Sequence, residues 1–293
     1  MANETVLTGI AHPTDEYSDV TSEALVDTIV VLPLILADNL PEETMTKYAR
    51  KKGSLTASSG GVKEGANYTT YSQYSTTGVP VTVIKDVVAS FVTAESRKFG
   101  KVDMELMFKE QGEAIARQLD DEILALISGF TQLVTATSTL EMDNLLDAAY
   151  MVRKSLKKAA AGRRLRCVLE YKGANDIRKE VIKSAASVYT LPVMLSLLGV
   201  PGQDEIPANG YVGEGPGFSV FEVAGVPKSN GDNIQLMFDG QTAFYGAYDT
   251  TIETLAIPKG TGNPSFGVEY SSLMWHGVAE YNDLAGCRIA SDS

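Results

Sequence analysis

The chain has 293 residues, 44% of them hydrophobic, which is enough for one large domain or two ordinary ones with a sizeable core. Its formal net charge of −12 argues against a basic face that grips nucleic acid. Two cysteines, two histidines and no long apolar run argue against a disulfide framework, a multi-histidine metal centre and a membrane helix. The charge fits either an ordinary acidic cytoplasmic protein or a container that repels packed DNA.

Residues 1–52 are predicted to form an extended arm with one short aliphatic anchor, Ile29 to Leu36. After the anchor, Asn39 and Pro41 indicate the start of a short helix that ends before Gly53. Half of this segment is polar and it has little core of its own. We therefore expect it to lie on another surface, such as a neighbouring subunit.

The segment 53–78 is rich in glycine, serine, threonine and tyrosine, and it leads into the alternating residues Val79, Val81 and Val83. This pattern predicts a long hairpin that ends in a half-buried strand. A hairpin with so few apolar residues is marginal alone, so it is either a mobile surface loop or an arm that packs on a neighbour. The second interpretation predicts five contact residues, Lys63, Glu64, Tyr68, Tyr71 and Tyr74, among which tyrosines suit an interface.

A long helix is predicted from Asp103 to Ser128, with Asp103 as its N-cap and Gly129 as its stop. Gly112 lies in the middle of this helix, where glycine costs about 1 kcal/mol relative to alanine. It marks either a hinge at which the helix bends or a place where another backbone packs closely. The buried stripe is expected to consist of Met104, Phe108, Gln111, Ile115, Leu119, Ile123 and Leu126.

The rest of the chain reads as helices followed by strands, which is an α+β order with no βαβ alternation. Helices are predicted at about 142–161, 175–185 and 191–198, around a strand at 165–169. Residues 199–217 are predicted to be a loop rich in glycine and proline. The closing strands are expected at 218–223, 243–248, 251–256, 266–273, 277–281 and 288–290.

The sequence predicts no catalytic, cofactor-binding or metal site. His12 and His276 are the only histidines, and His276 is interpreted as a partly buried strand residue. Asp120, Asp121 and Glu122 form a carboxylate run, but consecutive helix residues point in different directions, so the run is interpreted as a solvated face. We therefore expect that the protein is not an enzyme.

The order of these elements resembles the major capsid proteins of tailed bacteriophages, the family named after the Hong Kong 97 phage (the HK97-like fold). Residues 91–97 are similar to the strand that leads into the spine helix of that family, and residues 113–129 are similar to the spine helix itself. The similarity covers about residues 53–293 and contains no diagnostic motif. Its other segments are 210–213, 217–221, 243–255, 266–283 and 288–290.

The resemblance implies a division of the chain and a function. The parts are an N-terminal arm (1–52), an extended E-loop (53–88), a peripheral P-domain (89–137 and 247–281) and an axial A-domain (138–246 and 282–293). It also implies that Gly112 is a spine hinge and that the subunits form hexamers and pentamers of an icosahedral shell around double-stranded DNA, without sequence-specific binding. The expected location is the virion capsid, which is assembled in the host cytoplasm. No membrane partner is expected.

The resemblance also implies binding partners, and two alternative functions stay open. A portal and decoration proteins are expected, and a separate scaffolding protein is expected because the chain lacks a long segment before the arm. Covalent cross-linking is not carried over, since Lys63 lies in the right loop but no partner asparagine can be matched. The alternatives are an encapsulin-like bacterial nanocompartment shell and, from another class, a stand-alone α+β enzyme or binding module.

Overall fold

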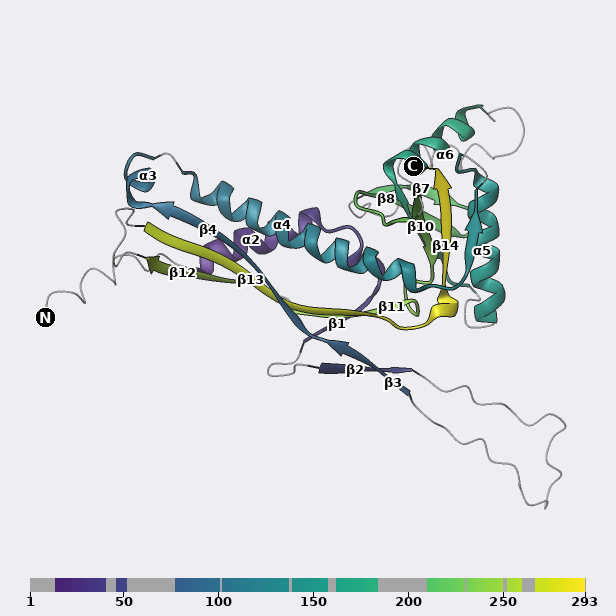
Figure 1. The fold of residues 1–293 in the computed structure, drawn as a ribbon, viewed down its shortest axis with the longest axis horizontal. Coiled ribbons are helices and arrows are strands. Elements are labelled where there is room, and N and C mark those ends of the chain that lie inside the picture. Colours follow the sequence, from purple (N-terminus) through teal and green to yellow (C-terminus); the bar gives the residue numbers. More distant parts are fainter. Residues whose placement is uncertain are drawn as a thin grey trace, which may run out of the picture.

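One long helix and two sheets organise the chain, as the computed structural model in Figure 1 shows. A five-stranded sheet lies along the helix α4 (Met104–Ala125), and a seven-stranded sheet forms the other end of the molecule with α5 (Met142–Leu156) and α6 (Tyr171–Lys183). This arrangement confirms the predicted α+β class. The structure describes residues 14–40, 46–51, 77–100, 102–136, 139–157, 162–183, 210–229, 231–249, 252–259 and 267–292.

Helix α4 begins as predicted, because the Asp103 side chain accepts a hydrogen bond from the backbone N–H of Leu106 at 3.3 Å. A short 3-10 turn, η2 (Leu126–Gly129), continues it to the predicted stop. Most of the predicted stripe is buried, and small or polar residues widen the buried face. The buried residues of α4 are Phe108, Gln111, Gly112, Ile115, Ala116, Leu119, Asp120, Ile123 and Leu124.

The N-terminal segment contains a helix, which corrects the prediction of an extended arm. Helix α2 (Thr14–Thr28) packs against α4 of the same chain, and the Tyr17 ring stacks on Phe108 with 4.5 Å between ring centroids. The aliphatic anchor follows as the 3-10 turn η1 (Leu32–Leu34), which is buried in the main core. The described part of this segment therefore lies on its own subunit.

The five-stranded sheet is built around one long strand, β13 (Gly267–Glu280). Two separate strands were predicted here, but β13 is continuous because different partners pair with successive parts of it. Antiparallel partners are β4 (Ile84–Thr93), β12 (Glu253–Lys259) and β11 (Phe244–Tyr248), and β1 (Leu36–Asn39) pairs in parallel with β11.

A two-stranded hairpin extends from the body below β11 in Figure 1. Its strands are β2 (Thr46–Lys51) and β3 (Thr77–Thr82), paired antiparallel from Thr46–Thr82 to Lys51–Thr77. The prediction of a short helix before Gly53 is therefore wrong for residues 46–51. These polar residues are held as a strand by their pairing with β3, which the local sequence does not reveal.

The seven-stranded sheet has a helical layer on one side and the main core on the other. The buried residues on one face of the sheet pack against α5 and α6. The buried residues on its other face pack against α4 and η1 in the main core. Four strands in it were not predicted, namely β5, β7, β9 and β10. Strand β7 falls in the expected loop 199–217, and β10 carries buried polar residues. The strands are β5 (Leu133–Thr135), β14 (Gly286–Asp292), β10 (Asp232–Phe238), β6 (Leu165–Glu170), β8 (Phe218–Val223), β7 (Tyr211–Gly215) and β9 (Lys228–Ser229).

Among the described residues, no helix is long and apolar enough to cross a membrane. The predicted helix at 191–198 lies outside the described residues, as does His12. The domain boundaries remain a prediction.

Candidate functional site

The five-stranded sheet presents an apolar face on the side away from the helices. Along β4, odd-numbered residues point to this side, because Gln111 of α4 binds the even-numbered Ser90 from the other side at 2.9 Å. The strand register then places alternate residues of β12 and β13 on the same side. This side also carries polar residues such as Lys85 and Glu269, and we call its exposed large apolar residues the outer sheet face: Val87, Phe91, Leu255, Ile257 and Trp275.

All five side chains of the outer sheet face are large, apolar and between 37% and 51% exposed. Lys85 lies over the Trp275 ring at 5.5 Å from its centroid, which is a cation–π contact at one end of the set. Helices α2 and α4 pack on the opposite side of this sheet, where Tyr270, Ser272 and Thr254 are buried. A clustered apolar surface of this kind is typical of a contact with another protein.

The hairpin is anchored to the body by its base. Ala49 and Val81 are buried there against Tyr245 and Ala247 of β11. Gly277 of β13 lies so close to the Thr82 carbonyl oxygen that a side chain at this position would overlap it. The five predicted contact residues, Lys63, Glu64, Tyr68, Tyr71 and Tyr74, lie outside the described residues, so their role remains a prediction.

Gly112 lies where α2 crosses α4. A Cβ atom at this position would overlap the carbonyl oxygen of Thr21 and would approach the Cβ of Ala24 to 3.1 Å. This contact supports close packing as the reason for the glycine, one of the two interpretations drawn from the sequence. Its role as a hinge remains a prediction.

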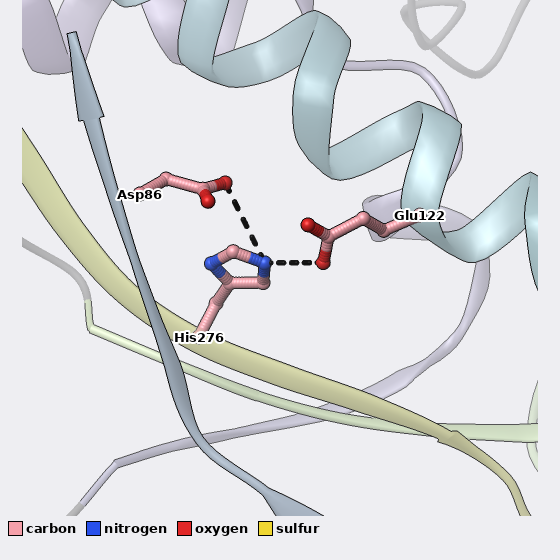
Figure 2. Close-up of side chains that lie close together, drawn as sticks. All are labelled: Asp86, Glu122 and His276. Atoms are coloured by element: carbon pink, nitrogen blue, oxygen red, sulfur yellow. Dashed lines mark hydrogen bonds and ion pairs between the residues drawn. The ribbon is translucent and has the colours of Figure 1, made fainter.

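His276 is the centre of a polar cluster that the sequence did not predict. Its ring is fully buried, and Nε2 lies 2.7 Å from Oε2 of Glu122 and 3.7 Å from Oδ2 of Asp86. Figure 2 shows both carboxylates turned toward this nitrogen, from α4 and β4 respectively. Burial raises the pKa of Asp86, which His276 opposes and Glu122 reinforces. His276 is thus buried more completely than expected.

The carboxylate run on α4 is also not a simple solvated face. Asp120 is buried, and its two oxygens accept hydrogen bonds from the backbone N–H groups of Val30 and Val31, each at 2.9 Å. Glu122 contacts His276, and only Asp121 is exposed. The sequence could not reveal this, because the partners of Asp120 and Glu122 are 90 and 154 positions away.

The fold has counterparts among solved structures of viral shells, although no protein-family model and no curated protein matches the chain. The capsid of Ralstonia phage GP4 aligns with a TM-score of 0.66 and 12% identity, covering 92% of this chain and 90% of that one. The head of Helicobacter pylori bacteriophage KHP40 gives 0.63 and 12%, with 91% of each chain covered. A virus-like particle from Pyrococcus furiosus gives 0.59 and 8%, covering 94% of this chain and 98% of that one.

These alignments extend over nearly the whole length of both chains. They show that this chain has the HK97-like fold of phage capsid subunits, as the resemblance of its segments implied.

Proposed function

We propose that the protein is the major capsid subunit of a tailed bacteriophage and that its function is self-association into a shell. The observation that carries this proposal is the outer sheet face, an exposed apolar surface on a chain with the fold of phage capsid subunits. Burial of one large apolar side chain contributes about 1.5–3 kcal/mol relative to exposure. A neighbour that covered this face would therefore stabilise an assembly.

In the proposed shell, the hairpin of one subunit lies on the outer sheet face of the next. Strands β2 and β3 extend from the body, and buried residues at their base hold them there, so the described part of the hairpin is in place before contact. Tyr68, Tyr71 and Tyr74 would supply large, rigid contact surfaces, and Lys63 and Glu64 would supply polar contacts at the rim. Repetition of this contact around rings would give hexamers and pentamers of an icosahedral particle.

The charge of the chain suits a container for double-stranded DNA. A net charge of −12 provides no broad basic surface for binding phosphates, so the enclosed DNA would be held without sequence-specific contacts. The proposed location is the virion capsid, after assembly in the cytoplasm of the host. A scaffolding protein, a portal and decoration proteins are the expected partners.

A second candidate is an encapsulin-like nanocompartment shell. The observation that favours it is the alignment with the virus-like particle from Pyrococcus furiosus, which covers 98% of that chain. In this case the particle would enclose proteins in place of DNA. The contents of particles purified from the native source separate the two candidates, because only a phage capsid would contain its genome. Neither candidate is an enzyme.

A matched pair of variants tests the role of the outer sheet face. Phe91→Ser removes an exposed apolar side chain from the face, and Phe99→Ser removes the same side chain from an exposed position outside it. We expect Phe91→Ser to fold normally but to lose the large particles in sedimentation velocity, because it weakens every copy of the contact. Phe99→Ser should assemble like the wild type. Unimpaired assembly of Phe91→Ser would contradict the proposed contact.

A further inference from the structure

The cluster of Asp86, Glu122 and His276 gathers three potential metal ligands from three elements. In the part of the chain that the structure describes, it is the group of three or more histidine, cysteine and carboxylate side chains whose ligand atoms all lie within 4.8 Å of one another. Figure 2 shows the two carboxylates approaching the same ring nitrogen, Nε2, from different directions. The cluster therefore converges on a single small volume.

Hydrogen bonds among the three residues leave a buried carboxylate oxygen of this cluster without a partner. Nε2 carries at most one proton, and Glu122 lies nearest to it, at 2.7 Å. Oδ2 of Asp86 is buried and has no hydrogen-bond partner among the described residues, although it lies 3.7 Å from Nε2. One imidazole supplies at most one positive charge, so the cluster is negative whenever both carboxylates are ionised, a state that the burial of Asp86 opposes. Buried charge of this kind is costly unless a cation compensates it.

We propose that Asp86, Glu122 and His276 bind a divalent transition-metal ion such as Zn²⁺. Imidazole nitrogen and carboxylate oxygen are ligands of Zn²⁺ at about 2.0–2.2 Å, and three protein ligands leave a further position for water. Two tetrahedral ligands at this distance from the ion lie about 3.3–3.6 Å apart, and the distances of 2.7 Å and 3.7 Å from Nε2 fall on either side of that spacing. Small side-chain movements would therefore complete the site.

The surroundings of the ring predict a moderate affinity. A histidine bound to metal through Nε2 carries its proton on Nδ1, which usually donates to a partner. Here Nδ1 is buried without a hydrogen-bond partner in the described residues. The loss of such a partner typically weakens metal binding by about 10–100-fold.

The position of the site gives the ion a structural role. Asp86 lies near the start of β4, just after the hairpin strand β3 ends at Thr82, whereas Glu122 lies near the end of α4. A bound ion would tie the chain that leaves the hairpin to both the long helix and β13. This inference rests on the geometry within one chain, so it does not depend on the proposed function.

Metal binding is tested on the full-length chain after removal of metal with a chelator. We expect Zn²⁺ alone to bind at one ion per chain in calorimetry and to raise the melting temperature. Glu122→Gln and Asp86→Asn each replace one ligand with a neutral side chain of similar shape and should weaken binding at least about 10-fold. Asp121→Asn is the matched control, because Asp121 is the exposed neighbour of Glu122 on the same helix.

The results distinguish a metal-binding site from a cluster held together by hydrogen bonds alone. Absence of stoichiometric Zn²⁺ binding, or binding that both Glu122→Gln and Asp86→Asn retain, would overturn the proposal. Co²⁺ bound to the wild-type chain provides a readout that needs no variant. Its absorption spectrum should show nitrogen and oxygen ligands, and a thiolate charge-transfer band would place the ion at a cysteine and overturn the assignment.

Discussion

Asp120 joins the N-terminal segment to the long helix through the backbone. Its carboxylate accepts hydrogen bonds from Val30 and Val31 at the point where the chain leaves α2 and enters the buried turn η1. Burial is the largest influence on this carboxyl and raises its pKa to about 6, although the backbone N–H groups, including that of Leu32, oppose the shift. The residue thus connects a local charge to the packing of α2.

Replacement of Asp120 by alanine should destabilise the protein by about 2–4 kcal/mol at pH 7. The substitution leaves the N–H groups of Val30 and Val31 buried without acceptors, and each such group costs about 1–3 kcal/mol. Denaturant unfolding of the two proteins measures the difference.

The pH dependence of this difference tests the cause of the shift. The folded pKa of about 6 is above the ordinary value of 3.8, so the proton-linked part of the Asp120 contribution is complete below about pH 3.8 and is lost as pH rises through 6, whereas the hydrogen bonds to Val30 and Val31 still contribute at pH 7. The stability gap between wild type and Asp120→Ala should therefore shrink from pH 4 to pH 7. A gap that widens would mean that the hydrogen bonds outweigh burial.

The close contact at Gly112 predicts how the substitution Gly112→Ala changes the stability of the protein. Alanine is the better helix former by about 1 kcal/mol, yet its Cβ would overlap the backbone of Thr21. Overpacking of this kind costs about 1–3 kcal/mol, so Gly112→Ala should lower the free energy of unfolding. A gain in stability would instead show that α2 yields easily at this point and would favour the hinge interpretation.

The sequence could predict single residues only where their partners are local. Asp103 was identified as an N-cap because its partner, Leu106, is three positions away. His276 and Glu122 meet only because β13 runs beneath α4, and no local pattern carries that information. The polar cluster was missed for this reason.

At the scale of elements, the strands β2 and β3 are fixed to the body, and the segment between them lies outside the described residues. Ala49 and Val81 bury the base against β11, so β2 and β3 belong to the fold of the subunit. The segment 52–76 joins these two strands and contains all five predicted contact residues. The base and the segment can therefore be tested separately.

Replacement of residues 55–74 by a short glycine–serine linker should leave the fold intact and abolish assembly. The β2–β3 pairing and its buried base remain in this variant, but the predicted contact residues are removed. Circular dichroism and sedimentation velocity report the two properties. Normal particles would refute the role of the segment in assembly, and unfolding would show that it belongs to the core of its own subunit.

The predicted helices and strands match the observed ones where the sequence has a clear pattern of apolar residues or a clear turn signal. Helix α4 occurs close to its predicted bounds because its buried residues repeat with the period of a helix, and strand β8 does so because a short, largely apolar run follows the turn at Gly217. Helix α2 was missed because its buried side includes Thr21 and Ala24. Strand β10 was missed because Asn233 and Gln235 are buried, where they bind Glu170 and Ser291.

At the scale of the whole molecule, two features fit a subunit that is complete only in an assembly. The outer sheet face exposes apolar side chains that a neighbour would cover, and the hairpin extends from the body. Identity of only 8–12% to the compared shells shows that the fold persists while most side chains differ. In the proposed shell, the contacts between subunits would therefore use side chains that this chain does not share with the compared shells.

Electron microscopy of the purified, negatively stained protein tests the central proposal most directly. The account predicts closed particles of uniform size, or ring-shaped capsomers under conditions that weaken apolar contacts. Images that contain only single subunits, over a wide range of protein and salt concentrations, would contradict it.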